Sequence, residues 1–510
     1  MGQKDIVLQL PADYTDNDLK KRISKKLNVK EFLYTIEKKS LDARQKRNIH
    51  WLIRLSVASK EIKGNVPDLT PPLIIPYQKR KEKAVVVGSG PAGFFSAFIL
   101  QKAGFHTTLI ERGSEVEKRA KEINAFEKGG IFSPANNYAF GEGGAGTFSD
   151  GKLTSRSKHI EGEKQFILSQ YISAGAPEEI RYLAHPHLGS DNLRGIVKNV
   201  REAFISLGGT VLFETILEDL NIKNGMVIEA ITASGSIEGD FFIIAPGHSA
   251  YETYRMLMKR GVQFRTKNFA IGSRVEHPQE IINRSQWGRD SVPGLQAAEY
   301  RLTSKGDGRP DVYTFCMCPG GKIVPAAVYE NTNVVNGMSF YKRDGKFANT
   351  ACVAAVNLDS LRGKTTTPQE ALDWVSAIEE KFYTYSDGYA APFCQIKDFI
   401  TRREASCVVE SSYPLGLKPA PLWDLLPAPV SNAIREGLKD FNKKIKGFET
   451  GLIMGLESKT SSPIQVVRDE RRCCEGFLNL YLVGEGSGYA GGIISSAVDG
   501  IKAVLGIINK

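Results

Sequence analysis

Residues 83–93 read KAVVVGSGPAG, and this stretch decides the fold of the chain. The apolar run over residues 84–87 is typical of a strand that is buried on both faces of a parallel sheet. It leads into the spacing G-x-G-x-x-G over residues 88–93, in which a glycine turn lets the backbone approach a pyrophosphate and a helix follows. Pro91 suits the first helical turn, because a backbone N–H at that position would have no hydrogen-bond partner within the helix. The stretch therefore predicts a strand, a phosphate-binding turn and a helix.

The sequence that follows supplies the other parts of a dinucleotide site. A second short strand is predicted over residues 106–110, after a helix that stops near Gly104. It ends in Glu111, 23 positions after Gly88. A carboxylate there accepts hydrogen bonds from the ribose hydroxyls of an adenosine. The unit predicts a bound dinucleotide but does not by itself separate NAD from FAD.

Two distant segments favour FAD. Residues 241–247, FFIIAPG, predict a buried strand followed by a tight turn. Near the C-terminus, an apolar strand over residues 478–483 runs into GEGSGYAGG, residues 484–492, and then a helix over 493–508. We expect this strand to return to the same sheet, with the helix N-terminus directed at the second phosphate and Glu485 bonded to the ribityl chain. A chain that returns about 230 residues later suits a cofactor as long as FAD.

A third glycine-rich segment covers residues 140–152 and reads FGEGGAGTFSDGK. No apolar strand precedes it, so it is not a second copy of the first motif. Its free N–H groups and polar side chains suit contact with the pyrophosphate or the flavin ring; the alternative is a mobile surface loop. Together the motifs predict cofactor contacts from Gly88, Ser89, Gly90, Pro91, Ala92, Gly93, Glu111, Arg112, Gly143, Gly144, Gly146, Thr147, Phe148, Ser149, Lys152, Gly247, Gly484, Glu485, Gly491, Gly492 and Ile493.

By these and other segments the chain resembles the NAD(FAD)-utilising family of FAD-dependent dehydrogenases, within the glutathione-reductase-like Rossmann flavoproteins. The resemblance implies bound FAD, a Rossmann-type flavin domain, an inserted α+β second domain and a small ferredoxin-like α+β module at the N-terminus. The segments that carry it, besides the first motif, are KKSLDARQK (38–46), FGEGGAGTFSDGKL (140–153), APGHSA (245–250), FAIGSRVEHPQ (269–279), YTFCMCPGG (313–321), NGMS (336–339), TSSP (460–463) and VGEGSGYAGGI (483–493).

The predicted fold class is therefore α/β, built from four segments. A small basic α+β module covers residues 1–75, and the first part of the FAD-binding domain covers 76–250. An inserted substrate or cap domain covers 251–475, and the C-terminal return covers 476–510.

Within the N-terminal module, the pattern predicts two strands, a helix and a basic loop. Strands are expected over residues 5–10 and 49–57, and a helix after the capping box formed by Thr15 and Asp18. Residues 38–47 have no apolar period and are expected to form the loop. A linker with Pro67, Pro71, Pro72 and Pro76 should follow.

The net charge of +10 is concentrated in this module. Residues 1–83 hold 19 Lys and Arg against 10 Asp and Glu, a balance of +9, which leaves +1 for the other residues. Such an excess suits an acidic partner such as nucleic acid, or simply a solvated basic surface. The second interpretation is the simpler one.

Several classes of protein are disfavoured by what the sequence lacks. It has no apolar stretch long enough to span a membrane and no apolar signal-peptide core in residues 1–10, so we expect a cytoplasmic location without a membrane partner. The seven cysteines include no C-x-x-C pair and the histidines no H-E-x-x-H, so no metal site is predicted. The odd number of cysteines indicates reduced thiols and not a set of disulfides. These cysteines are Cys316, Cys318, Cys352, Cys394, Cys407, Cys473 and Cys474.

Two residues are candidates for chemistry beyond the cofactor. Cys318, in Cys316-Met317-Cys318, would relay electrons or form an adduct if its thiolate lay near a flavin; the alternative is a small buried residue. His248 would act as an acid or a hydrogen-bond donor; the alternative is a bond to a backbone carbonyl.

Two functions are consistent with the sequence. The first is an FAD-dependent oxidoreductase that moves a hydride through flavin N5, on a small-molecule substrate that the sequence does not identify. NAD(P)H is the candidate electron donor; since no second nucleotide motif is found, it would bind transiently over the flavin or not at all. The alternative is a flavin-dependent protein recruited to RNA by its basic module. The sequence gives no oligomeric state.

Overall fold

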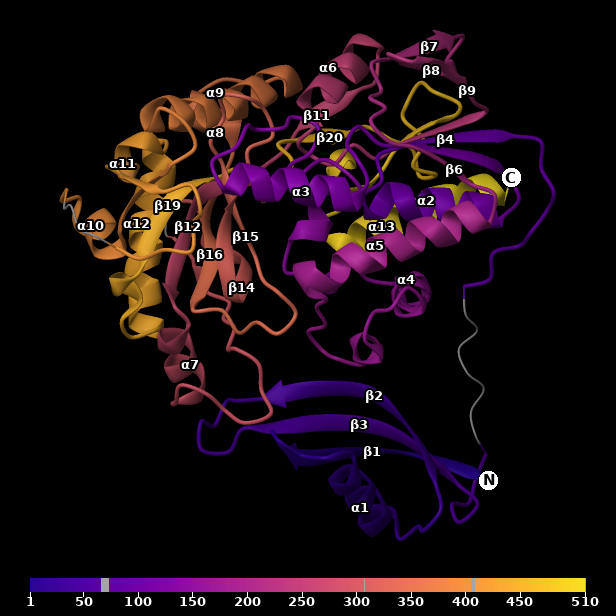
Figure 1. The fold of residues 1–510 in the computed structure, drawn as a ribbon, viewed down its shortest axis with the longest axis vertical. Coiled ribbons are helices and arrows are strands. Elements are labelled where there is room, and N and C mark those ends of the chain that lie inside the picture. Colours follow the sequence, from indigo (N-terminus) through magenta and orange to yellow (C-terminus); the bar gives the residue numbers. More distant parts are fainter. Residues whose placement is uncertain (66–72, 307, 405–408, 510) are drawn as a thin grey trace.

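The computed structural model describes residues 1–65, 73–306, 308–404 and 409–509 (Figure 1). Pro67, Pro71 and Pro72 of the expected linker, and Cys407, lie outside this part. Among the described residues, no helix combines the length and apolar character that crossing a bilayer requires.

A five-stranded parallel sheet carries the predicted nucleotide-binding unit. The apolar run 84–87 forms its middle strand, which is buried and paired on both sides, as predicted. The C-terminal strand also returns to this sheet, beside the strand at Phe241–Ile244, which confirms that part of the sequence prediction. The strand order is β21 (Leu480–Leu482), β10 (Phe241–Ile244), β4 (Lys83–Val87), β5 (His106–Ile110) and β6 (Thr210–Leu212).

Two helices pack side by side next to this sheet, and both follow a glycine turn. Helix α2 (Pro91–Lys102) is apolar on nearly every side, as expected of a helix inside a large core. The last helix, α13 (Ile493–Ile508), lies against it (Figure 1). The close approach needs Gly500, because a Cβ there would lie 2.3 Å from the Ala92 carbonyl oxygen. The other helices of this half are α3 (Val116–Glu127), α4 (Glu161–Ser173), α5 (Gly189–Ser206) and α6 (Tyr251–Lys259).

A larger sheet is formed by the chain between β10 and β21. It is largely antiparallel and has β14, β16 and β12 near its centre. Its strands, in order, are β13 (Thr303–Ser304), β14 (Val312–Pro325), β16 (Phe347–Val356), β12 (Phe269–Pro278), β19 (Leu452–Glu457), β17 (Ala391–Gln395) and β18 (Leu417–Pro419), with β15 (Val335–Met338) paired to β14. Its helices are α7 (Gln279–Trp287), α8 (Leu358–Arg362), α9 (Pro368–Ser386), α10 (Ile396–Thr401), α11 (Leu422–Leu425) and α12 (Ala428–Lys444).

Smaller pieces complete the body. A three-stranded meander follows β6 in the chain, and a two-stranded ribbon joins residues 264–266 to 464–466. The strands are β7 (Asp219–Lys223), β8 (Met226–Thr232), β9 (Gly235–Glu238), β11 (Phe264–Thr266) and β20 (Ile464–Val466). The short 3₁₀ helices of the described residues are η1 (Gly144–Phe148), η2 (Glu178–Arg181), η3 (Phe448–Thr450) and η4 (Gly484–Ser487).

The N-terminal module is a three-stranded antiparallel sheet with one helix. Its elements are β1 (Gly2–Pro11), α1 (Asp16–Leu27), β2 (Leu33–Asp42) and β3 (His50–Ser59), and Thr15 and Asp18 form the predicted capping box. This βαββ order lacks the second helix and fourth strand of a ferredoxin-like βαββαβ unit within residues 1–65, so that expectation is wrong.

The expectation of a basic loop over residues 38–47 is also wrong for residues 38–42. Residues 38–42 belong to strand β2, because they pair with β3 on one side. On its other edge Lys39 forms a bridge with Leu183 of the body, through bonds from the Lys39 N–H to the Tyr182 carbonyl (2.8 Å) and from the Ala184 N–H to the Lys39 carbonyl (2.9 Å). Residues 38–42 thus form a strand because they pair with residues far away in the sequence, although their own sequence has no regular spacing of apolar side chains.

Candidate functional site

One large cavity, of about 1360 Å³, lies between the parallel sheet and strand β14. Its wall contains backbone from all three glycine-rich segments. The segments also touch one another: a Cβ on Gly484 would lie 2.6 Å from the Ala92 Cβ, and one on Gly144 would lie 3.0 Å from the Gly90 Cα. Segments almost 400 positions apart therefore build one site, as the sequence predicts.

The first turn has the form that a pyrophosphate needs. Gly88 has φ +94°, and a Cβ there would lie 2.3 Å from the Ala245 carbonyl oxygen, so only glycine fits. Gly90 faces open space, since an added Cβ would meet nothing closer than the Gly144 Cα at 3.8 Å. Gly90 is also the N-cap of α2 and offers the first turn no side-chain cap. The free N–H groups and the positive end of the helix dipole suit an anion at this point.

Glu111 lies at the predicted place but is heavily bonded to protein. Its carboxylate accepts hydrogen bonds from the Ser89 N–H (2.9 Å), the Ser89 hydroxyl (2.7 Å), the Gly113 N–H (3.0 Å) and the Gly141 N–H (3.1 Å). A carboxylate has about four acceptor positions. Glu111 therefore joins the first turn to the 140–152 segment, and its contact with a ribose stays a prediction.

The 140–152 segment is part of the cavity wall and is largely buried, which contradicts the alternative of a surface loop. The fully buried guanidinium of Arg119 holds it, because Nη1 donates to the carbonyls of Gly141 (3.2 Å), Glu142 (2.7 Å) and Gly144 (2.9 Å). Sequence reasoning missed Arg119, since nothing local shows that α3 packs against this segment.

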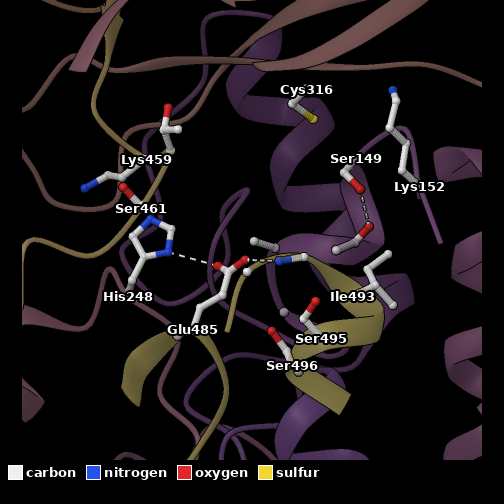
Figure 2. Close-up of a pocket in the computed structure, with 18 of the residues that line it drawn as sticks. Ser149, Lys152, His248, Cys316, Lys459, Ser461, Glu485, Ile493, Ser495 and Ser496 are labelled. Atoms are coloured by element: carbon white, nitrogen blue, oxygen red, sulfur yellow. Dashed lines mark hydrogen bonds and ion pairs between the residues drawn. The ribbon is translucent and has the colours of Figure 1, made fainter. Parts of the chain in front are cut away.

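The C-terminal segment brings a histidine and a carboxylate together. His248 Nδ1 and Glu485 Oε2 are 2.9 Å apart, and Glu485 Oε1 accepts the Gly492 N–H at 2.6 Å (Figure 2). Burial alone would raise the pKa of Glu485, but the bonds from His248 and Gly492 lower it, so the carboxylate is ionised. An ionised carboxylate only accepts, so Nδ1 is the donor and a neutral His248 has its acceptor at Nε2. The bond between Glu485 and the ribityl chain stays a prediction.

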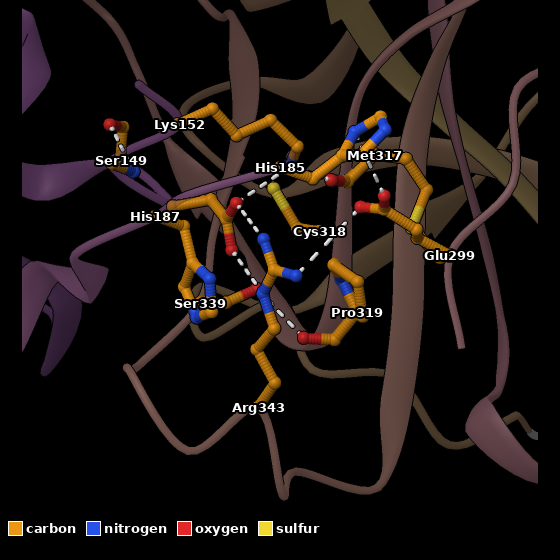
Figure 3. Close-up of polar contacts among 12 residues, drawn as sticks. Ser149, Lys152, His185, His187, Glu299, Met317, Cys318, Pro319, Ser339 and Arg343 are labelled. Carbon is orange, nitrogen blue, oxygen red and sulfur yellow. Dashed lines mark hydrogen bonds and ion pairs between the residues drawn. The ribbon is translucent and has the colours of Figure 1, made fainter. Parts of the chain in front are cut away.

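A charged cluster closes the cavity on the other side (Figure 3). Asp150, 1% exposed, binds Arg343 through two bonds (3.0 and 2.5 Å) and Lys152 through one (2.6 Å). Burial alone would raise the pKa of Asp150, but the two cations hold it well below its ordinary value. Lys152 also donates to the Met317 carbonyl, which joins the cluster to strand β14. Arg343 also faces Glu299 (Nη1 to Oε2, 3.8 Å), so the cluster consists of two cations and two carboxylates.

Strand β14 places Cys316, and not the predicted Cys318, at the cavity. Cys318 is fully buried and is absent from the cavity wall, whereas Cys316 is half-buried and lines it (Figure 2). Cys316 has φ +47° at an irregular register between β14 and β16. A simple alternation of side chains along the strand, the only signal in the sequence, cannot predict this change of direction.

Most of the predicted cofactor residues line the cavity, but four do not. Ser89, Gly93, Gly143 and Thr147 lie behind the wall and support it; a Cβ on Gly93, for example, would lie 1.9 Å from the Gly88 carbonyl oxygen. Those that line it are Gly88, Gly90, Pro91, Ala92, Glu111, Arg112, Gly144, Gly146, Phe148, Ser149, Lys152, Gly247, Gly484, Glu485, Gly491, Gly492 and Ile493, together with His248.

Other lining residues were not predicted. Lys459, Thr460 and Ser461 line the cavity, and the TSSP segment of the family resemblance (460–463) includes only the last two of them. Tyr138, Arg156, Thr215, Tyr313 and Ser495 also line the cavity. Within the described ranges, no group of His, Cys, Asp and Glu has the arrangement of a metal site.

Comparison with known proteins agrees with this site. Residues 81–126 match the model of an FAD binding domain, and residues 268–460 match a model described as FAD-dependent protein, C-terminal domain-like. Residues 2–58 match a domain of unknown function. An uncharacterized protein of Clostridium beijerinckii is 39% identical to this chain over 99% of this chain and 98% of its own length.

Solved structures show weaker likenesses. CtdE in complex with FAD is 12% identical, with 84% of each chain covered and a TM-score of 0.35. A geranylgeranyl bacteriochlorophyll reductase-like protein from Thermoplasma acidophilum is 14% identical, with 84% of this chain and 78% of that one covered and a TM-score of 0.36. Sequence identities and TM-scores this low support no conclusion about this chain.

The FAD binding model covers the strand, turn and helix on which the glycine turn was recognised, so FAD is the cofactor. The relative extends the match over almost the whole chain. The chain belongs to the family of the C. beijerinckii protein, a family of FAD-dependent flavoproteins of the oxidoreductase type.

Proposed function

We propose that this flavoprotein is a dehydrogenase that transfers a hydride between a small-molecule substrate and flavin N5, with NAD(P)H as a transient electron donor. We also propose that the flavin domain is of the glutathione-reductase-like Rossmann class, as the parallel sheet with its C-terminal return suggests. FAD, when bound, supplies the hydride acceptor and donor. The substrate is not identified.

The observation that carries the proposal is the continuity of the cavity. It begins at the phosphate-binding turn, passes the α13 N-terminus and extends to Tyr313 and Cys316 on β14. Its volume of about 1360 Å³ exceeds the 300–1,000 Å³ that is common for ligand sites. Such a cavity has room for a long cofactor and for a second molecule beside it.

His248 is suited to handle the proton that accompanies a hydride. Glu485 fixes the ring through Nδ1, and Nε2 is buried without a partner among the described residues. The side chain is 11% exposed and lies on the cavity wall, near Lys459 and Ser461 (Figure 2). We propose that a proton passes through Nε2 to an oxygen or nitrogen of the substrate when the adjacent carbon gains the hydride that NAD(P)H supplied to the cofactor.

The test is anaerobic reduction of the purified holoprotein by NADH and by NADPH, followed through the visible absorbance of the flavin. We expect one of the two to bleach the flavin, because the cavity admits a second molecule over the cofactor. Dithionite serves as the control that the bound flavin is reducible. If dithionite bleaches the flavin and neither nucleotide does, NAD(P)H is not the donor.

The structure provides no observation in favour of the RNA alternative. RNA-binding modules stack bases on aromatic rings, but Trp51 and Tyr34 of the basic module have partners within the protein: Lys39 Nζ lies 4.5 Å from the Trp51 ring centroid, and the Tyr34 hydroxyl donates to Asp16 (2.5 Å). The basic module instead contacts the body through β2. We therefore propose no nucleic-acid partner.

A further inference from the structure

Cys316 lies where strand β14 departs from regular pairing with β16. The register shifts between Phe315 and Cys318, and Cys316 has φ +47°, a left-handed conformation that a residue with a Cβ rarely adopts. As a result the two thiols of the Cys-x-Cys segment have different surroundings. Cys316 lines the cavity, and Cys318 is 0% exposed (Figures 2 and 3).

Two cations hold this segment: Arg274, which is fully buried, and Lys152, which is half-buried. Arg274, 0% exposed, donates from Nη2 to the Cys316 carbonyl (2.9 Å) and contacts Cys318 Sγ (3.8 Å). Lys152 donates to the Met317 carbonyl between the two cysteines. The Cys318 thiol donates to the Cys316 carbonyl at 3.3 Å. Cations beside a cysteine stabilise its thiolate, which is the reactive form.

A separate observation indicates that a polar ligand enters this cavity. His248 Nε2 and Thr460 Oγ1, both from lining residues, are buried and have no hydrogen-bond partner among the described residues. Buried polar atoms are nearly always bonded, so FAD, an ordered water or a second polar molecule in this cavity completes the bonding of these two atoms.

We propose that Cys316 is a nucleophilic thiolate that bonds covalently to an electrophilic carbon of a ligand in this cavity. The sulfur supplies both electrons of the new S–C bond. In a displacement the leaving group departs with the electron pair of its bond to carbon; in an addition to a carbonyl, the oxygen takes the displaced pair and then a proton from water. No electron passes to the flavin, so the proposal does not depend on the proposed dehydrogenase function.

The charges around the thiol support this assignment. The adjacent Cys318 thiol and the charges of Lys152 and Arg274 lower the pKa of Cys316 to about 6, although burial and Asp150 oppose them. The adjacent Cys316 and burial raise the pKa of Cys318 well above its ordinary value. At neutral pH the thiolate is therefore on the residue that faces the cavity.

The experiment uses the full-length holoprotein with iodoacetamide as the probe. In that reaction the S–C bond forms and iodide leaves. The protein is treated briefly between about pH 5 and pH 9, and the alkylated cysteine is identified by peptide mass mapping. We expect one fast-reacting thiol, Cys316, with half of its maximal rate near pH 6. At neutral pH it should react at least about tenfold faster than Cys352, whose pKa burial raises to about 12.

Four variants sharpen the result. C316S should lose the fast reaction and C318S should keep it. K152Q should move the half-maximal rate to higher pH, because one cation is lost, and K152R should restore it. If C316S does not fold, the peptide map of the wild-type protein still shows whether Cys316 is the fast-reacting thiol.

Three results would overturn the proposal. The first is fast alkylation at another cysteine, including Cys407, in place of Cys316. The second is a Cys316 that stays unreactive in the holoprotein. The third is a half-maximal rate near pH 8.5, as for an ordinary thiol.

Discussion

At the scale of single residues, the glycines of the first turn serve different purposes. Gly88 and Gly93 are required by the protein itself, because a Cβ at either position would collide with backbone. Gly90 is different, since a Cβ there meets only ordinary contacts and its space is left for a ligand. A substitution at Gly90 therefore tests the cofactor site with little effect on packing.

Gly90→Asp should fold and lose FAD, because it places a carboxylate against the cofactor phosphates. The measurement is the ratio of flavin to protein absorbance after purification, with a fall of at least about tenfold expected, or about 1.4 kcal/mol of binding free energy. Gly162→Asp is the matched control, since it adds the same side chain at an exposed helix position with nothing within 4 Å. A yellow Gly90→Asp protein with normal flavin content would refute the phosphate site.

His277 should make the fold sensitive to acid. It is fully buried, its Nε2 contacts the Phe448 carbonyl at 2.7 Å, and burial lowers its pKa from 6.5 to about 4. Below pH 6.5 His277 becomes protonated in the unfolded chain, whereas in the folded chain it stays neutral until about pH 4. The free energy of unfolding therefore falls as pH drops through this window, by up to about 3 kcal/mol.

His277→Gln removes this titration and keeps a possible donor to Phe448. Thermal unfolding midpoints, measured for both proteins at several pH values between 6.5 and 4, should fall more steeply for the wild type. Parallel pH profiles for the two proteins would show that His277 does not contribute.

Residue roles were predictable from sequence only where the signal is local. The positions of Gly88, Gly90 and Glu111 followed from spacing along one strand, turn and helix. The partners of Glu111 did not, because Gly141 comes from a segment 30 positions away. The choice of Cys318 failed for a similar reason, since the irregularity at Cys316 arises in pairing with β16.

At the scale of elements, the C-terminal return depends on one buried carboxylate. Asp499 of α13 accepts the Gly484 N–H at 3.0 Å, binds Arg468 through two bonds (2.9 and 2.7 Å) and binds Arg472 at 3.1 Å. It therefore fixes the turn before Glu485 to the helix that follows it. The sequence shows the strand, the turn and the helix, but not this link between them.

Asp499→Asn should lower both stability and flavin retention. It leaves the nearly buried Arg468 without its counter-charge, a loss of about 3 kcal/mol, and weakens the hold on the turn at Gly484. The measurements are the thermal unfolding midpoint and the rate of FAD loss on dilution. Asp373→Asn, which breaks an exposed pair with Arg255, is the control and should change neither. If both variants behave alike, Asp499 does not hold the turn.

At the scale of the whole molecule, the N-terminal module contacts the segment that forms part of the cavity wall. Lys39 bridges to Leu183, and the wall residues Ala184, His185 and Pro186 follow directly. The Lys39 side chain is enclosed between the rings of Tyr14 and Trp51. The module therefore supports the cavity from outside.

Lys39→Glu should loosen this contact, because a carboxylate would face two aromatic rings and Glu179, which now attracts the Lys39 cation. Hydrogen–deuterium exchange of peptides covering residues 182–188 should become faster, since the Ala184 N–H bonds to Lys39. Lys38→Glu, at an exposed neighbouring position, should leave the exchange unchanged. Equal protection in both variants would contradict a supporting role for the module.

The arrangement of the whole chain was predictable in outline. Apolar runs and glycine turns predicted the parallel sheet and the return of the C-terminal strand to it, because a buried strand is recognisable from its own run of apolar residues. The eight-stranded sheet was not resolved into strands by the sequence, since its pairings join distant segments such as β12, β16 and β19. The boundaries at residues 75, 250 and 475 stay predictions.

The most direct test of the account is an experimental structure of the holoprotein. Its central claim is that residues 88–93 and 484–493, at opposite ends of the chain, hold one FAD. We predict density for the pyrophosphate at Gly90 and the first turn of α2, with the flavin extending past Glu485 towards β14. FAD bound elsewhere, or touching only one of the two segments, would contradict the account.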